Sequence, residues 1–202
     1  SIETRFDVAA FGLLGYEMDL YNLSLLEEEQ VTKQIAFYKA HRKLLQFGKF
    51  YQLKTLDDDG YALWIVLSED KKEGVVGYFQ GLASSHPKVD VLHLADLIPD
   101  QLYVLEAREQ QTNIKLFGGL LNMAMPIKLN EDGLIMHIIS KYKSIEQFLK
   151  IKDVERYVVY GDALNSGAVK LNPQWYGTGV NEHVRVLADF GANIYYFHAI
   201  DA

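Results

Sequence analysis

Two carboxylates near the start of the chain, Glu17 and Asp19, have a spacing that could support catalysis. Two carboxyl groups a few ångströms apart can act as a general acid and as a base or nucleophile in hydrolysis. If "LLGYEMDL" (13–20) forms a strand, both side chains lie on one face, with backbones about 6.6 Å apart. A structural role is favoured, because catalytic pairs normally come from different strands and Asp19 stands where a turn or helix cap is expected.

No stretch of the sequence has the ligand spacing of a metal or nucleotide site. The six histidines show no H-x-H or H-E-x-x-H pattern, so a zinc site built from local sequence is not expected. "DDDG" (57–60) suggests a calcium loop, but Thr55 and Val66 stand where that loop needs Asp and Glu, so a hairpin turn is favoured. "GTGVNE" (177–182) lacks the third glycine of a dinucleotide-binding loop. We expect neither metal nor cofactor.

Three aromatic residues could stack against a sugar: Trp64, Trp175 and Tyr176. Core packing is the favoured role, and Trp64, inside an apolar run, is expected to be buried. Trp175 follows Pro173 in a predicted loop, so Trp175 and Tyr176 are the better candidates for a carbohydrate contact.

The composition excludes several classes of partner. The 202 residues include 20 Lys and Arg against 27 Asp and Glu, a net charge of -7, and no basic block is interleaved with aromatics, so nucleic-acid binding is not expected. The absence of cysteine excludes disulfides and fits a cytoplasmic protein. No apolar run reaches the roughly 20 residues that cross a bilayer, so no membrane partner is expected.

One long helix is predicted over residues 25–48. Ser24 and Glu27 form a capping box at its start. Apolar residues recur at helical spacing along it: Val31, Ile35, Tyr38 and Leu45. After Gly48 the hydrophobic period changes from about 3.6 to about 2, which places a domain boundary there.

Beyond Phe50 the pattern predicts an antiparallel β-sandwich. Short β-rich runs alternate with turn residues, at 61–68, 74–82, 101–107 and 134–142. The runs 183–190 and 193–200 are predicted to pair as a closing hairpin, and 144–151 is predicted to form at most two helical turns. No helices alternate with these strands, so a parallel sheet is not favoured.

The opening run, residues 1–24, predicts a different arrangement. Its spacing favours a short helix, then an apolar strand at 13–20, then the long helix, which is the repeat of a parallel α/β structure. Such a strand has no parallel neighbour here, so we expect further structure to precede it. Without that structure, "VAAFGLLGYEM" (8–18) would have to be covered by the sandwich, by a second copy or by disorder.

Several motifs in order carry a family resemblance. They are "TRFDVAAFGLLGYEMDL", "QIAFYKAHRKLLQFGKFYQL", "ALWIVLSEDKKEGVV" and "VYGDALNSGAVKL...YGTGVNEHVRVLADFG". Together they resemble the C-terminal end of glycoside hydrolase family 36 α-galactosidases of the bacterial type. The likeness covers nearly the whole chain and is weakest over 110–156.

The resemblance implies a cytoplasmic oligomer with an N-terminal β-supersandwich, a central (β/α)8 barrel and a C-terminal antiparallel β-sandwich. Residues 1–49 then correspond to the last βα segment of the barrel and residues 50–202 to the sandwich. The two catalytic aspartates of the family lie on earlier barrel strands, so no residue here is assigned as catalytic. Glu17 is expected at the barrel rim.

Three functions compete. In the first, the chain is the structural, oligomer-supporting end of a retaining α-galactosidase that acts on melibiose- or raffinose-type sugars, with the remainder of its own enzyme as partner and no activity alone. The alternative is a non-catalytic carbohydrate-binding sandwich that uses Trp175 or Tyr176. The third is a self-sufficient hydrolase that uses Glu17 and Asp19 and loses turnover on Glu17→Gln.

Overall fold

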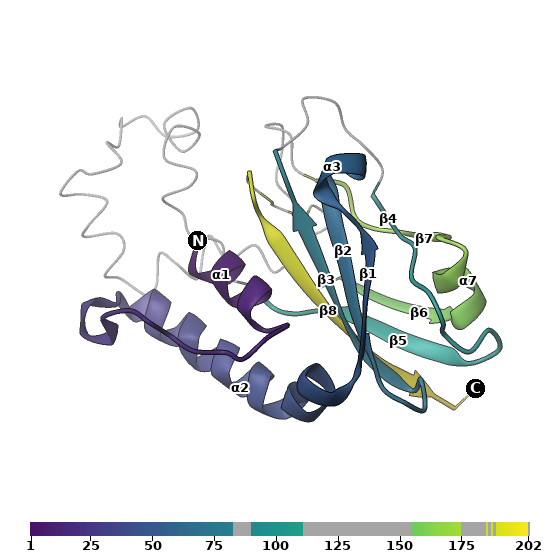
Figure 1. Cartoon of the computed structure of the whole chain (residues 1–202), viewed down its shortest axis with the longest axis horizontal. Coiled ribbons are helices and arrows are strands. Elements are labelled where there is room, and N and C mark those ends of the chain that lie inside the picture. The colour runs from purple at the N-terminus through teal and green to yellow at the C-terminus, as the bar shows by residue number, and fades with distance from the viewer. Residues whose placement is uncertain (83–89, 111–154, 175–184, 186, 188, 202) are drawn as a thin grey trace, which may run out of the picture.

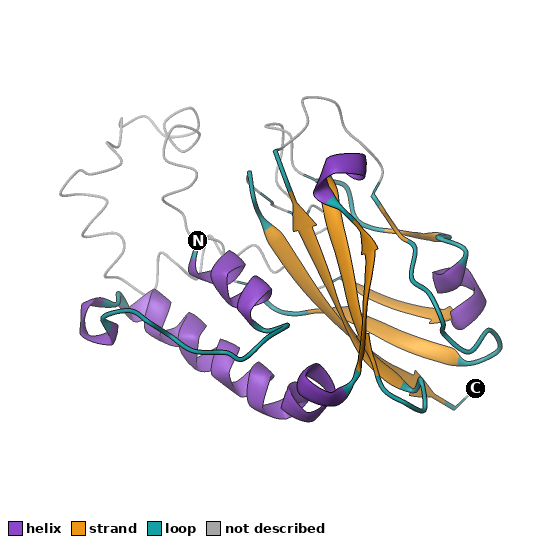
Figure 2. Cartoon of the chain, in the orientation of Figure 1, coloured by secondary structure: helices purple, strands orange, loops and turns teal. Residues whose placement is uncertain are grey.

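The computed structural model describes residues 1–82, 90–110, 155–174, 185, 187 and 189–201 (Figure 1). The elements of this part of the chain are, in order, α1 (Ile2–Ala9), the 3-10 helix η1 (Leu20–Asn22), α2 (Leu25–Phe47), β1 (Lys49–Lys54), α3 (Leu56–Asp59), β2 (Tyr61–Leu67), β3 (Glu73–Gln80), β4 (Val91–Leu92), β5 (Leu102–Ala107), β6 (Arg156–Tyr160), α7 (Gly161–Asn165), β7 (Val169–Lys170) and β8 (Ala192–Ile200). Figure 2 shows most of the strands side by side in one twisted sheet, with α1 and α2 beside it.

Two antiparallel sheets account for the described strands. Six strands form the larger sheet in the order β1-β2-β3-β8-β5-β6, and β4 pairs with β7 in the smaller one. The last strand, β8, lies between β3 and β5, with Tyr195 opposite Val76 and Phe197 opposite Leu105. These long-range pairs join the C-terminal strand to the middle of the domain.

The main hydrophobic core lies between the two sheets. Alternate residues of the large sheet, such as Ile65 and Val76, are fully buried and cluster with Leu92 of β4 and Val169 of β7. Strand side chains point alternately to the two faces of a sheet, so this face of the large sheet forms one layer of a sandwich. The predicted antiparallel β-sandwich is confirmed.

Helices α1 and α2 cover part of the opposite face of the large sheet. Phe6 of α1 and Leu44 of α2 pack with Val66, Val75 and Ile194 in a second buried cluster. The large sheet is therefore buried on both faces where α1 and α2 lie on it, which explains why all but the first residue of β3 are buried.

The long helix α2 forms as the sequence predicts, within one residue at its C-terminal end. Ser24 accepts a hydrogen bond from the Glu27 amide at 3.3 Å, and the Glu27 carboxylate accepts one from the Ser24 amide at 2.9 Å, so the predicted capping box is confirmed. Of the predicted apolar positions, Val31, Tyr38 and Leu45 are buried. No helix among the described residues is long and apolar enough to cross a membrane.

The opening run differs from its prediction. A helix does form, as α1, but residues 13–17 have no regular structure, so the predicted strand at 13–20 is wrong for this structure. An apolar run becomes a strand only where a neighbour can pair with its backbone, and this run instead contacts α2, where the Leu14 amide and the Tyr16 hydroxyl donate to Tyr38 and Gln34. Within 8–18, the sandwich covers Ala10 and packs against Phe11, as one of the alternatives anticipated, while Leu13 stays 87% exposed.

The predicted strands at 61–68, 74–82 and 101–107 are confirmed as β2, β3 and β5. The "DDDG" segment connects the paired strands β1 and β2, as its turn prediction requires, through the short helix α3. Gly60 ends α3 with a left-handed φ of 76°, a conformation that glycine adopts without strain. The predicted strand at 134–142 and the helix at 144–151 lie outside the described residues. The predicted hairpin between 183–190 and 193–200 is wrong, because β3 and β5 already pair with the two edges of β8.

Candidate functional site

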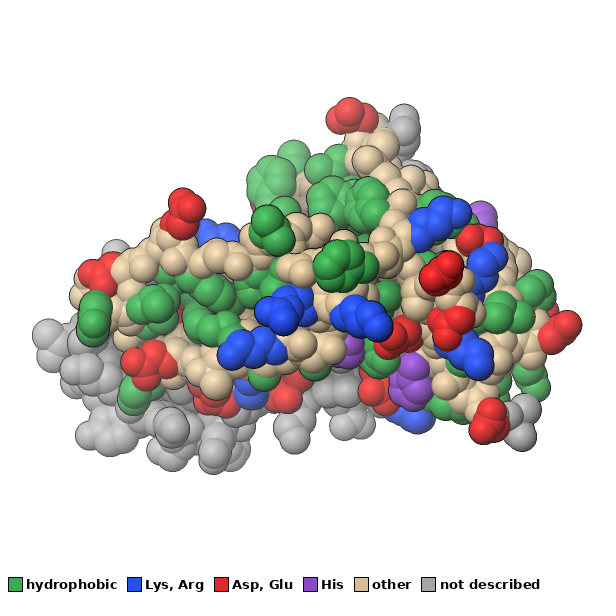
Figure 3. All heavy atoms as spheres, turned by 60° about the horizontal axis from the view of Figure 1, so that its bottom comes forward, with side chains coloured by type: hydrophobic (Ala, Val, Ile, Leu, Met, Phe, Trp, Pro, Cys, Tyr) green, Lys and Arg blue, Asp and Glu red, His purple; other side chains and the backbone are tan. Residues whose placement is uncertain are grey.

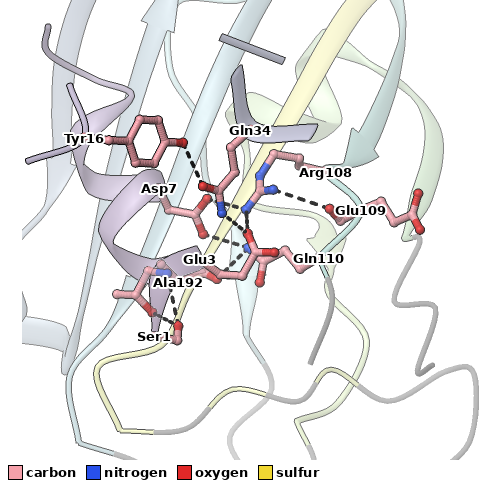
Figure 4. A network of polar contacts seen from close by, with 10 residues as sticks. Ser1, Glu3, Asp7, Tyr16, Gln34, Arg108, Glu109, Gln110 and Ala192 are labelled. Atoms are coloured by element: carbon pink, nitrogen blue, oxygen red, sulfur yellow. Dashed lines mark hydrogen bonds and ion pairs between the residues drawn. The ribbon is translucent and has the colours of Figure 1, made fainter. Parts of the chain in front are cut away.

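Five polar side chains meet where α1 and α2 pack beside the end of β5 (Figure 4). This helix–sheet cluster consists of Glu3, Asp7, Gln34, Arg108 and Gln110. Arg108 Nη2 donates to Glu3 Oε2 at 2.6 Å and to Asp7 Oδ1 at 2.8 Å. Gln34 Nε2 donates to the same Glu3 oxygen at 2.9 Å, and Gln110 Nε2 donates to Asp7 Oδ2 at 2.7 Å. One set of hydrogen bonds thus joins α1, α2 and the segment after β5.

Local structure explains how the two acids meet one arginine. Glu3 and Asp7 are four residues apart on α1, so they share one face of the helix. Arg108 directly follows β5 and continues its pairing with β8, because its amide donates to the Ile194 carbonyl at 2.7 Å. The arginine is thereby fixed by the sheet, and the helix brings both carboxylates to it.

The helix–sheet cluster buries two carboxylates against a single guanidinium. Glu3 is 7% exposed, Asp7 0% and Arg108 9%. Burial raises the pKa of Asp7 to about 7, although Arg108 opposes this shift. Burial acts to lower the pKa of Arg108, but the charges of Asp7 and Glu3 outweigh it and raise that pKa, so the guanidinium stays protonated.

Two further contacts surround the helix–sheet cluster. Tyr16 Oη donates to Gln34 Oε1 at 2.8 Å, and burial raises the pKa of this phenol to about 12, so it remains a donor at neutral pH. At the surface, Lys33 Nζ lies 3.2 Å from Glu29 and 3.4 Å from Glu109. The lysine is thus paired with other acids at the rim.

A second buried group, the inter-sheet cluster, lies between the two sheets. It consists of Asp90, Glu155, Gln174, Arg185 and Tyr195. Arg185 Nη2 forms an ion pair with Asp90, which also accepts from Gln174 Nε2 at 2.8 Å. Arg185 Nε is 4.0 Å from Glu155 Oε1, and Tyr195 Oη donates to Glu155 Oε2 at 2.6 Å. Tyr195 of β8 and residues from segments outside the strands thus meet at one arginine.

Backbone groups complete the inter-sheet cluster. The Asn172 amide donates to Glu155 Oε1 at 2.5 Å, and the Asn172 carbonyl accepts from Arg185 Nε at 2.7 Å. Burial, followed by the charge of Glu155, raises the pKa of Tyr195 well above its usual value, so its hydroxyl stays protonated. Arg185 itself is 0% exposed.

These arrangements favour holding elements together over catalysis. The four carboxylates of the two clusters are each less than a tenth exposed and each bonds an arginine, an amide or a phenol. Enclosed acids of this kind offer no open position for a sugar or an attacking water. Within the described ranges, no three acidic or histidine side chains form a group that could hold a metal ion.

The residues singled out from the sequence lie outside both clusters. Glu17 is exposed in the irregular segment after α1. Asp19 caps η1 by accepting from the Tyr21 amide at 3.0 Å, as the cap prediction requires. The third hypothesis placed Glu17 and Asp19 on a strand, and that strand is absent here. Trp175 and Tyr176 lie outside the described residues, so their proposed carbohydrate contact stays a prediction.

Trp64 is half-buried on the face of the large sheet that α1 and α2 partly cover, which is less than the burial predicted for it. Its ring meets Phe11 edge-on at a centroid distance of 5.7 Å and packs against Phe79 at 4.5 Å. Core packing is therefore its role, as favoured from the sequence.

The sequence reasoning did not single out Glu3, Asp7, Arg108 or Arg185. One signal was available for the first two: acids four residues apart in a helix whose neighbouring positions are Phe6 and Ala10. An acid on the apolar face of a helix must find a buried partner. The sequence alone does not identify this partner as Arg108, which lies 105 residues after Glu3 and 101 after Asp7.

The relatives found by sequence are bacterial α-galactosidases. Alpha-galactosidase AgaA of Geobacillus stearothermophilus is 39% identical over 151 residues, covering 73% of this chain and 20% of its own length. Alpha-galactosidase 1 of Pediococcus pentosaceus is 39% identical over 119 residues, covering 59% of this chain and 16% of its own. The chain therefore spans about a fifth of the length of these relatives.

Solved structures and family comparisons agree with this likeness. The crystal structure of the α-galactosidase from Lactobacillus brevis matches 100% of this chain and 20% of its own, with a TM-score of 0.65 and 26% identity. AgaA bound to stachyose, as a variant, matches 99% of this chain and 20% of its own, with a TM-score of 0.63 and 26% identity. Residues 1–48 match the melibiase family, and residues 61–197 match the C-terminal domain of glycosyl hydrolase family 36. The chain belongs to glycosyl hydrolase family 36, whose C-terminal domain it contains.

Proposed function

We propose that this chain serves as the C-terminal part of a retaining α-galactosidase, which removes terminal α-linked galactose from melibiose- or raffinose-type sugars. Its catalytic aspartates would come from a part of the enzyme outside this sequence, and the chain alone would be inactive. The enzyme would work in the cytoplasm as a homo-oligomer.

The order of the two family matches carries this proposal. A melibiase segment at 1–48 followed by the family 36 C-terminal domain at 61–197 is what the end of such an enzyme would contain. The relative AgaA is named an α-galactosidase, and the matched region makes up 20% of its length. The described carboxylates of the two buried clusters are already bonded, which supports a catalytic pair supplied from elsewhere.

Exposed apolar side chains support a structural role for the chain. Leu13 is 87% exposed, Phe47 is 82% exposed and Tyr21 is fully exposed. Figure 3 shows hydrophobic side chains reaching the surface on the face that includes α2. We infer that the remainder of the enzyme covers this N-terminal apolar surface, defined by Val8, Leu13, Leu20, Tyr21, Leu25 and Phe47. Large exposed apolar patches commonly mark such interfaces.

An activity comparison tests the proposal. The 202-residue chain and the complete polypeptide that contains it are each assayed with 4-nitrophenyl α-galactoside. We expect turnover with the complete polypeptide and none with the chain, and proton NMR of the first product should show the α-anomer of galactose. Turnover by the chain would contradict the proposal, and its loss in Glu17→Gln would then favour the third hypothesis.

Calorimetric titration of the chain with melibiose separates the structural role from carbohydrate binding. We expect no heat of binding. Binding that disappears in Trp175→Ala but persists in Trp64→Phe would instead support the alternative of a carbohydrate-binding module.

A further inference from the structure

The two outer strands of the large sheet, β1 and β6, differ in how their open edges are protected. Strand β1 has a lysine at each end, Lys49 and Lys54, and its pairing with β2 is irregular between Gln52 and Lys54. Edge lysines and irregular pairing discourage further strands from adding to a sheet. Strand β6 pairs with β5 without a break, and four of its five residues are Tyr or Val, which favour strands. Of the two described edges, the one at β6 is therefore suited to further pairing.

Hydrogen bonds at the two ends of β6 show which of its backbone groups point outward. Just before the strand, the Glu155 carbonyl accepts from the Ala107 amide at 2.8 Å. Just after it, the Gly161 amide donates to the Gln101 carbonyl at 2.9 Å. Residues that alternate along a strand bond the same neighbour, so the odd-numbered residues of β6 bond β5. The backbone groups of the even-numbered residues point to the opposite side, where no described strand lies.

The even-numbered side chains of β6 are also accessible to solvent. The Arg156 side chain is 54% exposed, Val158 is 48% exposed and Tyr160 is 49% exposed. They lie on the face of the sheet away from the main core, against which Tyr157 and Val159 pack. A strand that adds to this edge thus meets exposed residues, and substitutions at Val158 leave the core intact.

We propose that β6 pairs with β6 of a second copy of this chain, antiparallel and with Val158 on the two-fold axis. The large sheets of the two copies then join into one continuous sheet. In this register Val158 lies opposite Val158 of the second copy, and Arg156 of each copy lies opposite Tyr160 of the other. The inference names a contact surface for the proposed homo-oligomer, and to that extent it rests on the proposed function.

The charges and side chains of β6 favour a second copy as the occupant of this edge. Arg156 begins the strand, and the exposed Asp162 stands two residues beyond its end. Two-fold antiparallel pairing brings the basic end of each strand to the acidic end of the other and places Arg156 beside the Tyr160 ring, a cation–π contact. It also sets Tyr157 opposite Val159, and aromatic residues pair well with β-branched ones across strands. The same strand thus supplies both halves of a complementary contact.

Amide exchange in β6 tests the pairing, because the Val158 amide points outward whereas the Val159 amide points to β5. The parent chain is measured over about a hundredfold range of concentration. Above the dissociation constant, the fraction of free monomer falls with the square root of concentration, so protection of the Val158 amide should rise by up to about tenfold. The Val159 amide should be protected at every concentration.

A charge exchange on the axis tests the register. Val158→Lys alone places two lysines opposite each other, and Val158→Glu alone places two glutamates, so each variant should lose the concentration-dependent protection of the amide at this position. An equimolar mixture of the two variants should regain it, because Lys then lies opposite Glu. Gln52→Lys, at an exposed position of β1, is the matched control and should keep the parental behaviour.

Protection of the Val158 amide that does not change with concentration in the parent overturns the proposal, as does a mixture of the Lys and Glu variants that stays unprotected. An equal loss in Gln52→Lys overturns it too, since the effect would then not belong to β6. Protection found only in the complete polypeptide, at every concentration, would mean that another segment of the enzyme occupies the edge, and the proposal would fail. None of these results depends on α-galactosidase activity, so this inference and the proposed function can fail separately.

Discussion

At the scale of single residues, Arg185 holds together acids that come from segments far apart in the sequence. Asp90 precedes β4 and Glu155 precedes β6, and both face the same fully buried guanidinium. Its guanidinium carbon also lies over the Tyr78 ring, 5.3 Å from the ring centroid. The two sheets are thereby joined by charge as well as by apolar packing.

Arg185→Met should therefore destabilise the chain strongly. Methionine fills a similar volume but leaves Asp90 and Glu155 buried without their cation, and breaking a buried pair in this way costs about 3 to 5 kcal/mol. Urea unfolding followed by circular dichroism measures the change in the free energy of unfolding.

Arg156→Met is the matched control. The Arg156–Glu106 pair links β6 to β5 within the large sheet, and its side chains are 54% and 45% exposed. Exposed ion pairs contribute less than about 1 kcal/mol, so its unfolding midpoint should stay close to that of the parent. Equal losses in the two variants would show that Arg185 is not a stabilising link between the sheets.

Neither buried cluster could be predicted as a site from the sequence, and the reason is physical. Arg185 lies in the run "HVRVLADF", where alternation marks it only as one side of a strand. Whether that side faces water or a buried acid depends on sheet pairing across the whole domain. Asp19 was predictable because its role as a cap involves its own neighbours in the chain.

At the scale of elements, local sequence patterns predicted α2 correctly but wrongly predicted a strand before it. The capping box of α2 closes between residues three apart, so its energy does not depend on the rest of the fold. The strand at 13–20 needed a partner strand, and its apolar composition could not supply one. The order of strands in the sheet was likewise beyond prediction, because β8 pairs with strands about 90 and 120 residues before it in the chain.

Ser24→Ala should weaken α2 at its first turn. The substitution removes the acceptor of the Glu27 amide, at a cost of about 1 kcal/mol in the free energy of unfolding. Thermal unfolding by calorimetry gives the change. Thr32→Ala is the control on the same helix, because its hydroxyl donates to the Glu28 carbonyl in the helix interior and alanine favours helix there. A loss in Thr32→Ala as large as that in Ser24→Ala would contradict the capping argument.

Gly161→Ala should disturb the junction between β6 and α7. A Cβ at Gly161 would collide with the backbone carbonyl of Ile98, which cannot move aside as a flexible side chain could. Overpacking of this kind costs about 1 to 3 kcal/mol. At Gly15 nothing lies within 4 Å of an added Cβ, so Gly15→Ala should leave the unfolding midpoint almost unchanged. The two variants are compared by urea unfolding, and equal midpoints would refute the steric explanation.

At the scale of the whole molecule, the large sheet has two different covers. One face is closed by the smaller sheet and its loops, and the other is closed in part by α1 and α2. The apolar residues of α1 and α2 that face the sheet are buried, while the N-terminal apolar surface points away from it and remains exposed. The chain thus satisfies its own core and still presents apolar area that a partner can bury.

The double substitution Leu13→Ser and Phe47→Ser should weaken self-association of the isolated chain without lowering its stability. Both side chains are more than four-fifths exposed, so the folded monomer loses little packing, whereas a contact that buries them loses about 1.5 to 3 kcal/mol for each. Sedimentation equilibrium should show a dissociation constant at least about tenfold higher than in the parent. Leu82→Ser is the control, since Leu82 is 71% exposed but lies beside the Gly81–Gly60 contact at the α3 end of the sheet. An equal effect of Leu82→Ser would mean that association is non-specific, and an unchanged dissociation constant in the double variant would show that copies of the isolated chain do not associate through the N-terminal apolar surface.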